Sequence, residues 1–161
     1  MNPVGSRSVA KDMGLANAYE SDVLGRRVEF QTRLLEAKTA WEAAHDDFVT
    51  DRTTLDNLVY SVMQGAAGIT ESYLEAACRA LLRYQYIVYC PVSVFIDLQD
   101  DPQRVADMTY HSLYDATLFG MLQKFRPPDT RVITMPFQRL DHRKDYLRQM
   151  MAPARSSTRT P

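Results

Sequence analysis

Two short apolar runs that end at proline constrain the fold of this chain more than any other feature of its sequence. Residues Tyr86–Cys90 are apolar and rich in β-formers and stop at Pro91, and Arg131–Met135 repeat the pattern before Pro136. Proline cannot donate a hydrogen bond to a strand ladder, so each strand ends there. A strand that is apolar throughout is typical of a parallel sheet covered on both faces. We therefore expect Tyr86–Cys90 to be buried on both sides.

Helical segments alternate with these runs. Apolar positions at three- and four-residue steps predict helices, and a third short strand is expected at Phe48–Thr50. The expected helices cover residues 8–15, 26–45, 53–64, 70–84, 108–125 and 138–150. Strands alternating with helices predict an α/β fold, a three-layer parallel sheet with helices on both faces. Three strands are few for such a sheet, so we expect it to be incomplete at its N-terminal side.

Length and composition indicate one domain. The chain has 161 residues, of which 45% are hydrophobic, enough for one core. We assign residues 1–150 to this domain and residues 151–161 to a tail that is disordered by composition. A net charge of -1 argues against nucleic acid as an obligate partner. No apolar run reaches the roughly 18 residues of a membrane span, and the start lacks a secretory signal. The expected location is cytoplasmic.

A carboxylate and a guanidinium stand side by side at the end of the third expected strand. Charges in this position lie where open α/β sheets bind ligands. Asp51 could hold Mg²⁺ through water or accept the proton of a substrate hydroxyl; alternatively it is a strand-end aspartate that starts the next helix. Arg52 could clamp a substrate phosphate or carboxylate, and its alternative role is a surface ion pair.

Two further residues of the following helix are substrate-binding candidates. Asp56 lies in the first helical turn, where a carboxylate caps the helix together with Thr53 whatever else it does. Tyr60 lies one turn later, and it is either a wall of a substrate site or a packed aromatic side chain.

The run Val49-Thr50-Asp51-Arg52-Thr53-x-Leu55-Asp56-x-x-x-Tyr60 resembles the central motif of the P-loop NTPase and kinase superfamily. Within that superfamily the chain is similar to AAA-type ATPase/kinase domains such as nicotinamide riboside kinase. Residues 7–14 resemble a segment whose arginine, here Arg7, reaches the substrate. Residues 100–104 resemble the lid, which makes Arg104 a catalytic residue that contacts the ATP phosphates. Arg104 could instead be a solvated arginine that balances the two aspartates before it.

The resemblance implies an ATP-dependent kinase for a small molecule of the nucleoside or nucleotide type, or an ATPase, with ATP and Mg²⁺ as cofactors. Such proteins hold phosphates in a Gly-x-x-x-x-Gly-Lys-[Ser/Thr] loop, and this chain contains none. Relative to the family we expect the first strand and phosphate loop to be lacking, as in a fragment, a mis-started reading frame or a degenerate member. The alternative function is a non-catalytic binding protein that forms homo-oligomers through its exposed sheet.

Overall fold

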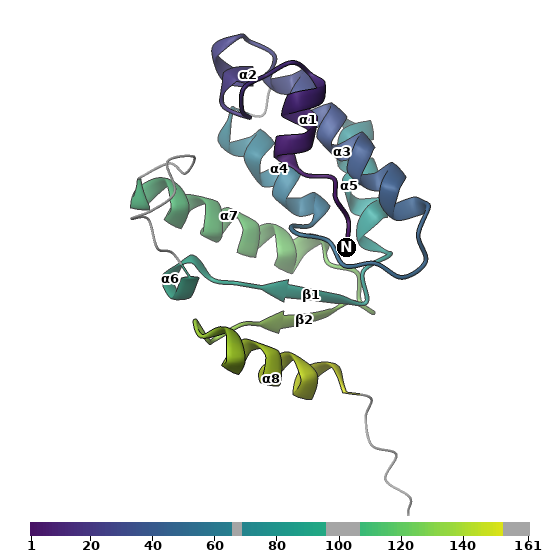
Figure 1. The fold of residues 1–161 in the computed structure, drawn as a ribbon, viewed down its shortest axis with the longest axis vertical. Coiled ribbons are helices and arrows are strands. Elements are labelled where there is room, and N and C mark those ends of the chain that lie inside the picture. The colour runs from purple at the N-terminus through teal and green to yellow at the C-terminus, as the bar shows by residue number, and fades with distance from the viewer. Residues whose placement is uncertain (66–68, 96–106, 153–161) are drawn as a thin grey trace, which may run out of the picture.

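The structure is a computed structural model that describes residues 1–65, 69–95 and 107–152. It contains helices and two strands, shown in Figure 1. In chain order they are α1 (Ser6–Asp12), α2 (Glu20–Val23), α3 (Arg27–Ala43), α4 (Thr54–Met63), α5 (Glu71–Leu81), β1 (Tyr86–Tyr89), α6 (Val92–Phe95), α7 (Met108–Phe125), β2 (Arg131–Thr134) and α8 (Leu140–Met151). The tail predicted after residue 150 falls largely outside the described residues.

The main helices begin and end where local chemistry predicts. The Thr53 hydroxyl accepts a hydrogen bond from the Leu55 N–H, and Asp56 completes a capping box at the start of α4. The Thr70 hydroxyl caps α5 in the same way. Gly65, with φ of 94°, follows α4 in the left-handed region that glycine adopts without strain. The predicted helical segments 26–45, 53–64 and 70–84 are therefore confirmed with small shifts at their ends.

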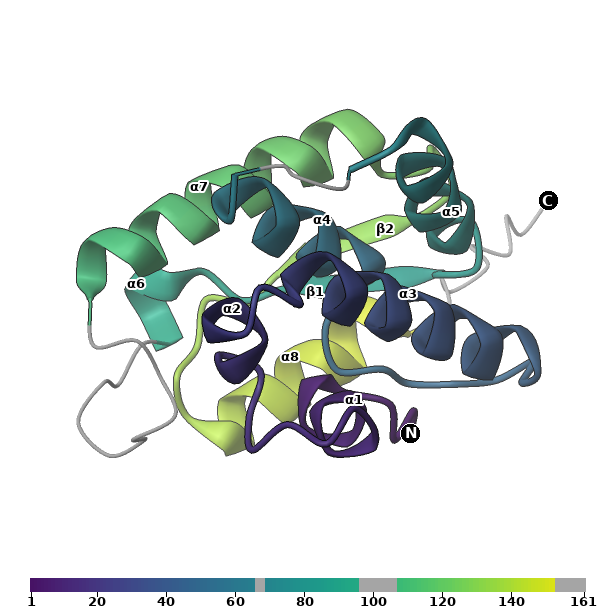
Figure 2. The ribbon, with the colours of Figure 1, turned by 90° about the horizontal axis from the view of Figure 1, so that it is seen from above.

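The α/β part of the predicted fold is confirmed, but the sheet is smaller than expected. Strands β1 and β2 pair in parallel, with Tyr86 opposite Arg131 and Tyr89 opposite Thr134. Figures 1 and 2 show α7 on one side of these strands and α8 on the other. Among the described residues the sheet has these two strands alone, so the predicted three-layer sheet is not confirmed.

The predicted strand at residues 48–50 is wrong. This segment does not form a β-strand, and Val49 is 69% exposed. One backbone bond holds it, from the Asn2 N–H to the Val49 carbonyl (2.7 Å). Its β-forming residues give an extended chain that pairs with no neighbouring strand among the described residues.

The expected burial of β1 on both faces is also wrong. Ile87 and Tyr89 point into the core, whereas Val88 remains 38% exposed on the opposite face. Ile133, beside Val88 in the parallel register, is buried. Between the expected helices 8–15 and 26–45, the chain forms the short helix α2.

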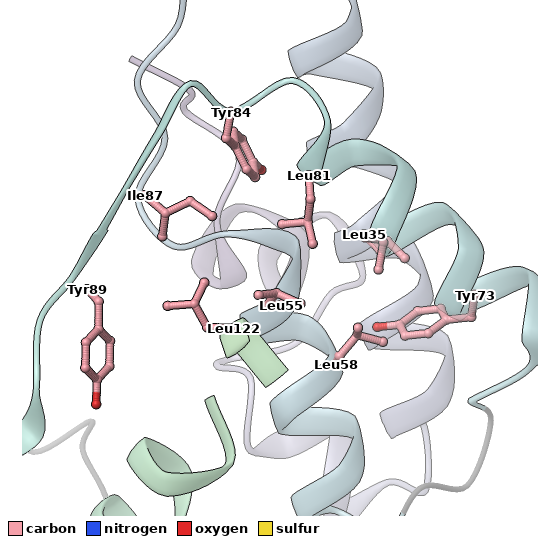
Figure 3. Close-up of a cluster of buried hydrophobic side chains, with 10 residues drawn as sticks. Leu35, Leu55, Leu58, Tyr73, Leu81, Tyr84, Ile87, Tyr89 and Leu122 are labelled. Atoms are coloured by element: carbon pink, nitrogen blue, oxygen red, sulfur yellow. The ribbon is translucent and has the colours of Figure 1, made fainter. Parts of the chain in front are cut away.

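The main core lies between β1 and helices α3, α4, α5 and α7 (Figure 3). Its buried side chains are Leu35, Leu55, Leu58, Tyr73, Ala77, Leu81, Tyr84, Ile87, Tyr89 and Leu122. A second cluster joins α1 to α3 through Val9, Ala10, Met13, Leu15 and Phe30. Helix α4 is central, since it packs on α3, α5 and α7. Every described helix is too short or too polar to cross a membrane.

Val59 and Val49 form a matched pair that tests this arrangement. Val59 on α4 is fully buried, whereas Val49 is exposed. Val59→Ala should lower the free energy of unfolding by roughly 1–3 kcal/mol, and Val49→Ala by less than about 0.5 kcal/mol. Urea unfolding followed by circular dichroism measures both. Equal costs would show that residues 48–50 are buried after all.

The core tyrosines predict a loss of stability at alkaline pH. Burial is the largest cause that raises the pKa of Tyr73, Tyr84 and Tyr89. The unfolded chain ionises its tyrosines near pH 10, while the folded chain keeps these protons. Above about pH 10 the unfolded state therefore binds fewer protons, and stability falls by up to about 1.4 kcal/mol per pH unit for each protected tyrosine.

Urea unfolding across this pH range, together with tyrosinate absorbance, measures the effect. Burial lowers the pKa of Lys38. This shift affects stability in the opposite direction, because the unfolded chain keeps the lysine proton longer, and stability rises as the pH approaches about 10. The decline should consequently begin above that pH. Tyr73→Phe removes one titrating hydroxyl and should make the decline shallower, and an unchanged slope would contradict the assignment.

Candidate functional site

The candidate site is the stretch that joins α3 to α4, where Asp51 and Arg52 lie at the surface. Asp51 is within electrostatic range of the carboxyl end of β1. Burial raises the pKa of the Cys90 thiol just after that strand; Arg143 lowers this pKa, and Asp51 raises it. The Asp51 carboxylate makes no hydrogen bond or ion pair with the described residues. Because this side chain is exposed, it is accessible to a ligand.

A buried ion pair on α3, Lys38 with Glu42, lies against this stretch. Lys38 and Glu42 are one helical turn apart, and Nζ lies 3.6 Å from Oε1 with both side chains almost fully buried. The Lys38 ammonium also donates to the Thr50 hydroxyl (2.5 Å) and to the Asp51 carbonyl (3.1 Å). The exposed Asp51 side chain therefore rests on a main chain that is fixed from the interior.

Glu42 is completed by donors from two distant segments. Its Oε1 accepts from the Asn2 amide (3.2 Å), and its Oε2 accepts from the Tyr84 hydroxyl (2.9 Å). Buried charges are costly unless they are paired and hydrogen-bonded, and Glu42 satisfies both conditions. The network joins the N-terminus, α3, residues 49–51 and the chain that enters β1.

Arg52 has an uncommon backbone conformation. Its φ of 66° lies in the left-handed region, and it is the one non-glycine residue in the described part of the chain to do so. Such a conformation costs about 1–3 kcal/mol and persists where the surroundings enforce it. The guanidinium donates through Nη1 to the Tyr60 hydroxyl (2.8 Å) and lies 5.2 Å from the centroid of that ring. Arg52 and Tyr60, both predicted from the sequence, are thus brought together.

Asp56 has a structural role in the folded chain. Its Oδ2 accepts from the Thr53 N–H (2.7 Å) and hydroxyl (3.1 Å), and its Oδ1 accepts from the Tyr114 hydroxyl on α7 (2.5 Å). Both carboxylate oxygens are engaged, which matches the capping role that the sequence favoured. Contact of Asp56 with a substrate stays a prediction.

Tyr114 is a site residue that the sequence did not reveal. Burial, and next the charge of Asp56, raises the pKa of Tyr114, so it remains a protonated donor. Its ring lies 4.9 Å from the Tyr60 ring. Tyr110, one turn earlier on α7, has its pKa raised to about 12 by burial and then by Tyr60 and other neighbours. Tyr110 and Tyr114 are four residues apart and so lie on the same face of α7. This spacing was the sequence signal that could have indicated Tyr114.

The two remaining predicted residues are Arg7 and Arg104. Arg7 is exposed on α1, and no hydrogen bond or ion pair links it to another described residue. Arg104 lies outside the described residues. Their proposed contacts with substrate and phosphates stay predictions from the resemblance.

The described residues fit Mg²⁺ in part and do not fit the triphosphate of ATP. Mg²⁺ keeps several waters and often binds through one carboxylate plus substrate phosphates, which Asp51 could provide. No cluster of three or more metal-ligating side chains is present in the described ranges. The sequence also has no glycine-rich loop with lysine to cradle phosphates.

Comparison with known proteins gives one result. A family model described as AAA domain matches residues 6–139, well over half of the chain. No curated protein and no solved structure matches. The matched range contains α1 to β2 and the whole candidate site, and the chain therefore belongs to the AAA domain family, a group of P-loop NTPase-type nucleotide-binding domains.

Proposed function

We propose that residues 51–60 and α7 form the acceptor side of a phosphotransfer site for a small molecule of the nucleoside or nucleotide type. Membership of the AAA domain family supports nucleotide binding in general. The observation that carries the finer proposal is the strained Arg52, which is held against Tyr60. It follows Asp51, whose carboxylate has no hydrogen-bond or ion-pair partner among the described residues. Strained residues of this kind gather at functional sites.

Each residue has a distinct role in this proposal. Asp51 accepts the proton of the substrate hydroxyl, or binds Mg²⁺ through water, because its carboxylate is accessible. Arg52 is always charged and presents planar donors to an anionic group. Tyr60 and Tyr114 form an aromatic wall beside it. Donor phosphates would be held elsewhere, with Arg104 as the lid residue that the resemblance implies.

Mg-ATP titration calorimetry and a phosphotransfer assay with a panel of nucleosides test this proposal. Asp51→Asn and Arg52→Gly should each weaken acceptor binding or turnover by about tenfold or more, since a charged hydrogen bond is lost. Glycine is chosen for position 52 because it adopts φ of 66° without strain, so the fold is retained.

Asp46→Asn is the matched control, since Asp46 is also exposed in the α3–α4 connection and lies outside the site. It should leave binding and turnover unchanged. Wild-type chain that neither binds Mg-ATP nor phosphorylates any acceptor would rule the proposal out.

A second candidate function, self-association through the sheet, has its own supporting observation. Strand β1 pairs with β2 on one edge, and no other strand in the described part of the chain covers its opposite edge. Val88 is 38% exposed on this strand. Unpaired strand edges accept strands from other chains, and a second copy is the occupant we propose. Light scattering that shows a dimer abolished by Val88→Lys would support this function, and a monomer at all concentrations would exclude it.

A further inference from the structure

We propose that Lys38, acting with Glu42, is the positioning residue for Asp51 and Arg52. The inference rests on the proposed function of these two residues and extends it to a side chain that cannot touch the substrate. Lys38 is 3% exposed, so any influence on a ligand must pass through the main chain of residues 50–52.

The Lys38 ammonium has three N–H donors, and three oxygen groups lie around it. These are the Thr50 hydroxyl, the Asp51 carbonyl and the Glu42 carboxylate. The first two accept hydrogen bonds, and the Glu42 carboxylate forms an ion pair at 3.6 Å. Two of its three partners belong to residues 50–51 and one belongs to α3. Lys38 therefore links α3 to the candidate site.

The network replaces the strand ladder that the stretch lacks. Val49, Thr50 and Asp51 are each held by one bond, from the Asn2 N–H or from Lys38. In a sheet, neighbouring strands would supply such bonds. Here the bond to the Asp51 carbonyl comes from a side chain on a helix, so the orientation of the next residue depends on that side chain.

Arg52 is the residue that this arrangement controls. The peptide group between Asp51 and Arg52 contains the carbonyl that Lys38 holds, and Thr53 after it is fixed by the α4 cap. Arg52 is therefore clamped at both ends, which explains how its left-handed conformation persists. Release of the Asp51 carbonyl should allow Arg52 to relax to negative φ and to leave Tyr60.

The test uses the double variant Lys38→Met/Glu42→Gln in the full chain. Methionine keeps most of the lysine volume. The glutamine carbonyl can still accept from the Asn2 amide while its NH2 group donates to the Tyr84 hydroxyl, so no buried charge is left unpaired. Glu29→Gln/Arg33→Met is the matched control, because this pair has the same helical spacing on α3 but is exposed. Thr50→Val removes one contact and leaves the charged pair intact.

The first measurement is amide hydrogen exchange, which does not require a ligand. The Thr53 and Leu55 amides donate within the α4 cap. Their protection should fall about tenfold in the double variant, as expected for loss of one charged hydrogen bond, and less in Thr50→Val. Amides in the centre of α4 should be unchanged in both, and the control should match wild type throughout.

The second measurement is acceptor affinity, which should fall about tenfold with the loosened cap. If the ion pair had a purely structural role, the double variant would be less stable, but the exchange rates of the α4 cap amides and the acceptor affinity would not change. Unchanged values for both would overturn the inference. If wild type binds no acceptor, the proposed function fails, while loosened cap exchange in the double variant would still establish the positioning role.

Discussion

The buried ion pair between Lys38 and Glu42 is the contact on which the surrounding structure depends. It joins four parts of the chain that are distant in sequence: the N-terminal Asn2, helix α3, the stretch before α4, and Tyr84 before β1. Removing one partner would leave an uncompensated charge in the interior, at a cost that usually exceeds the net gain from the intact pair. The pair therefore matters less for net stability than for the geometry that it enforces.

That geometry explains why the site lies where it does. In an extended sheet, residues before a helix are aligned by the neighbouring strands, and side chains at the carboxyl ends meet along one edge. The described sheet has two strands, and residues 48–50 are not among them. Lys38 of the ion pair instead holds the Asp51 carbonyl, and the Arg52 guanidinium after it donates to the Tyr60 hydroxyl.

The sequence predicted the helices well because their signals are local. The apolar period of α4 and its Thr53/Asp56 cap are contained within a few residues. The strand at 48–50 could not be judged in this way, since β-forming residues favour an extended chain whether a ladder or side chains hold it. Lys38 and Glu42 show the same limit. Opposite charges one turn apart usually form a solvated pair that contributes little to stability. Here the pair is buried, and Glu42 accepts a hydrogen bond from Tyr84, which lies 42 residues away in the sequence.

The site residues divide along the same line. Asp51, Arg52 and Tyr60 belong to one contiguous run and could be named from it, whereas Tyr114 reaches Asp56 across 58 residues. The Asp56 carboxylate links the two groups, because one oxygen caps α4 and the other accepts from α7. The orientation of α7 against α4 is thereby connected to the turn that contains Arg52. The Tyr60 ring packs against Tyr114. We therefore infer that a ligand that draws Arg52 away from Tyr60 would change the packing of the N-terminal half of α7.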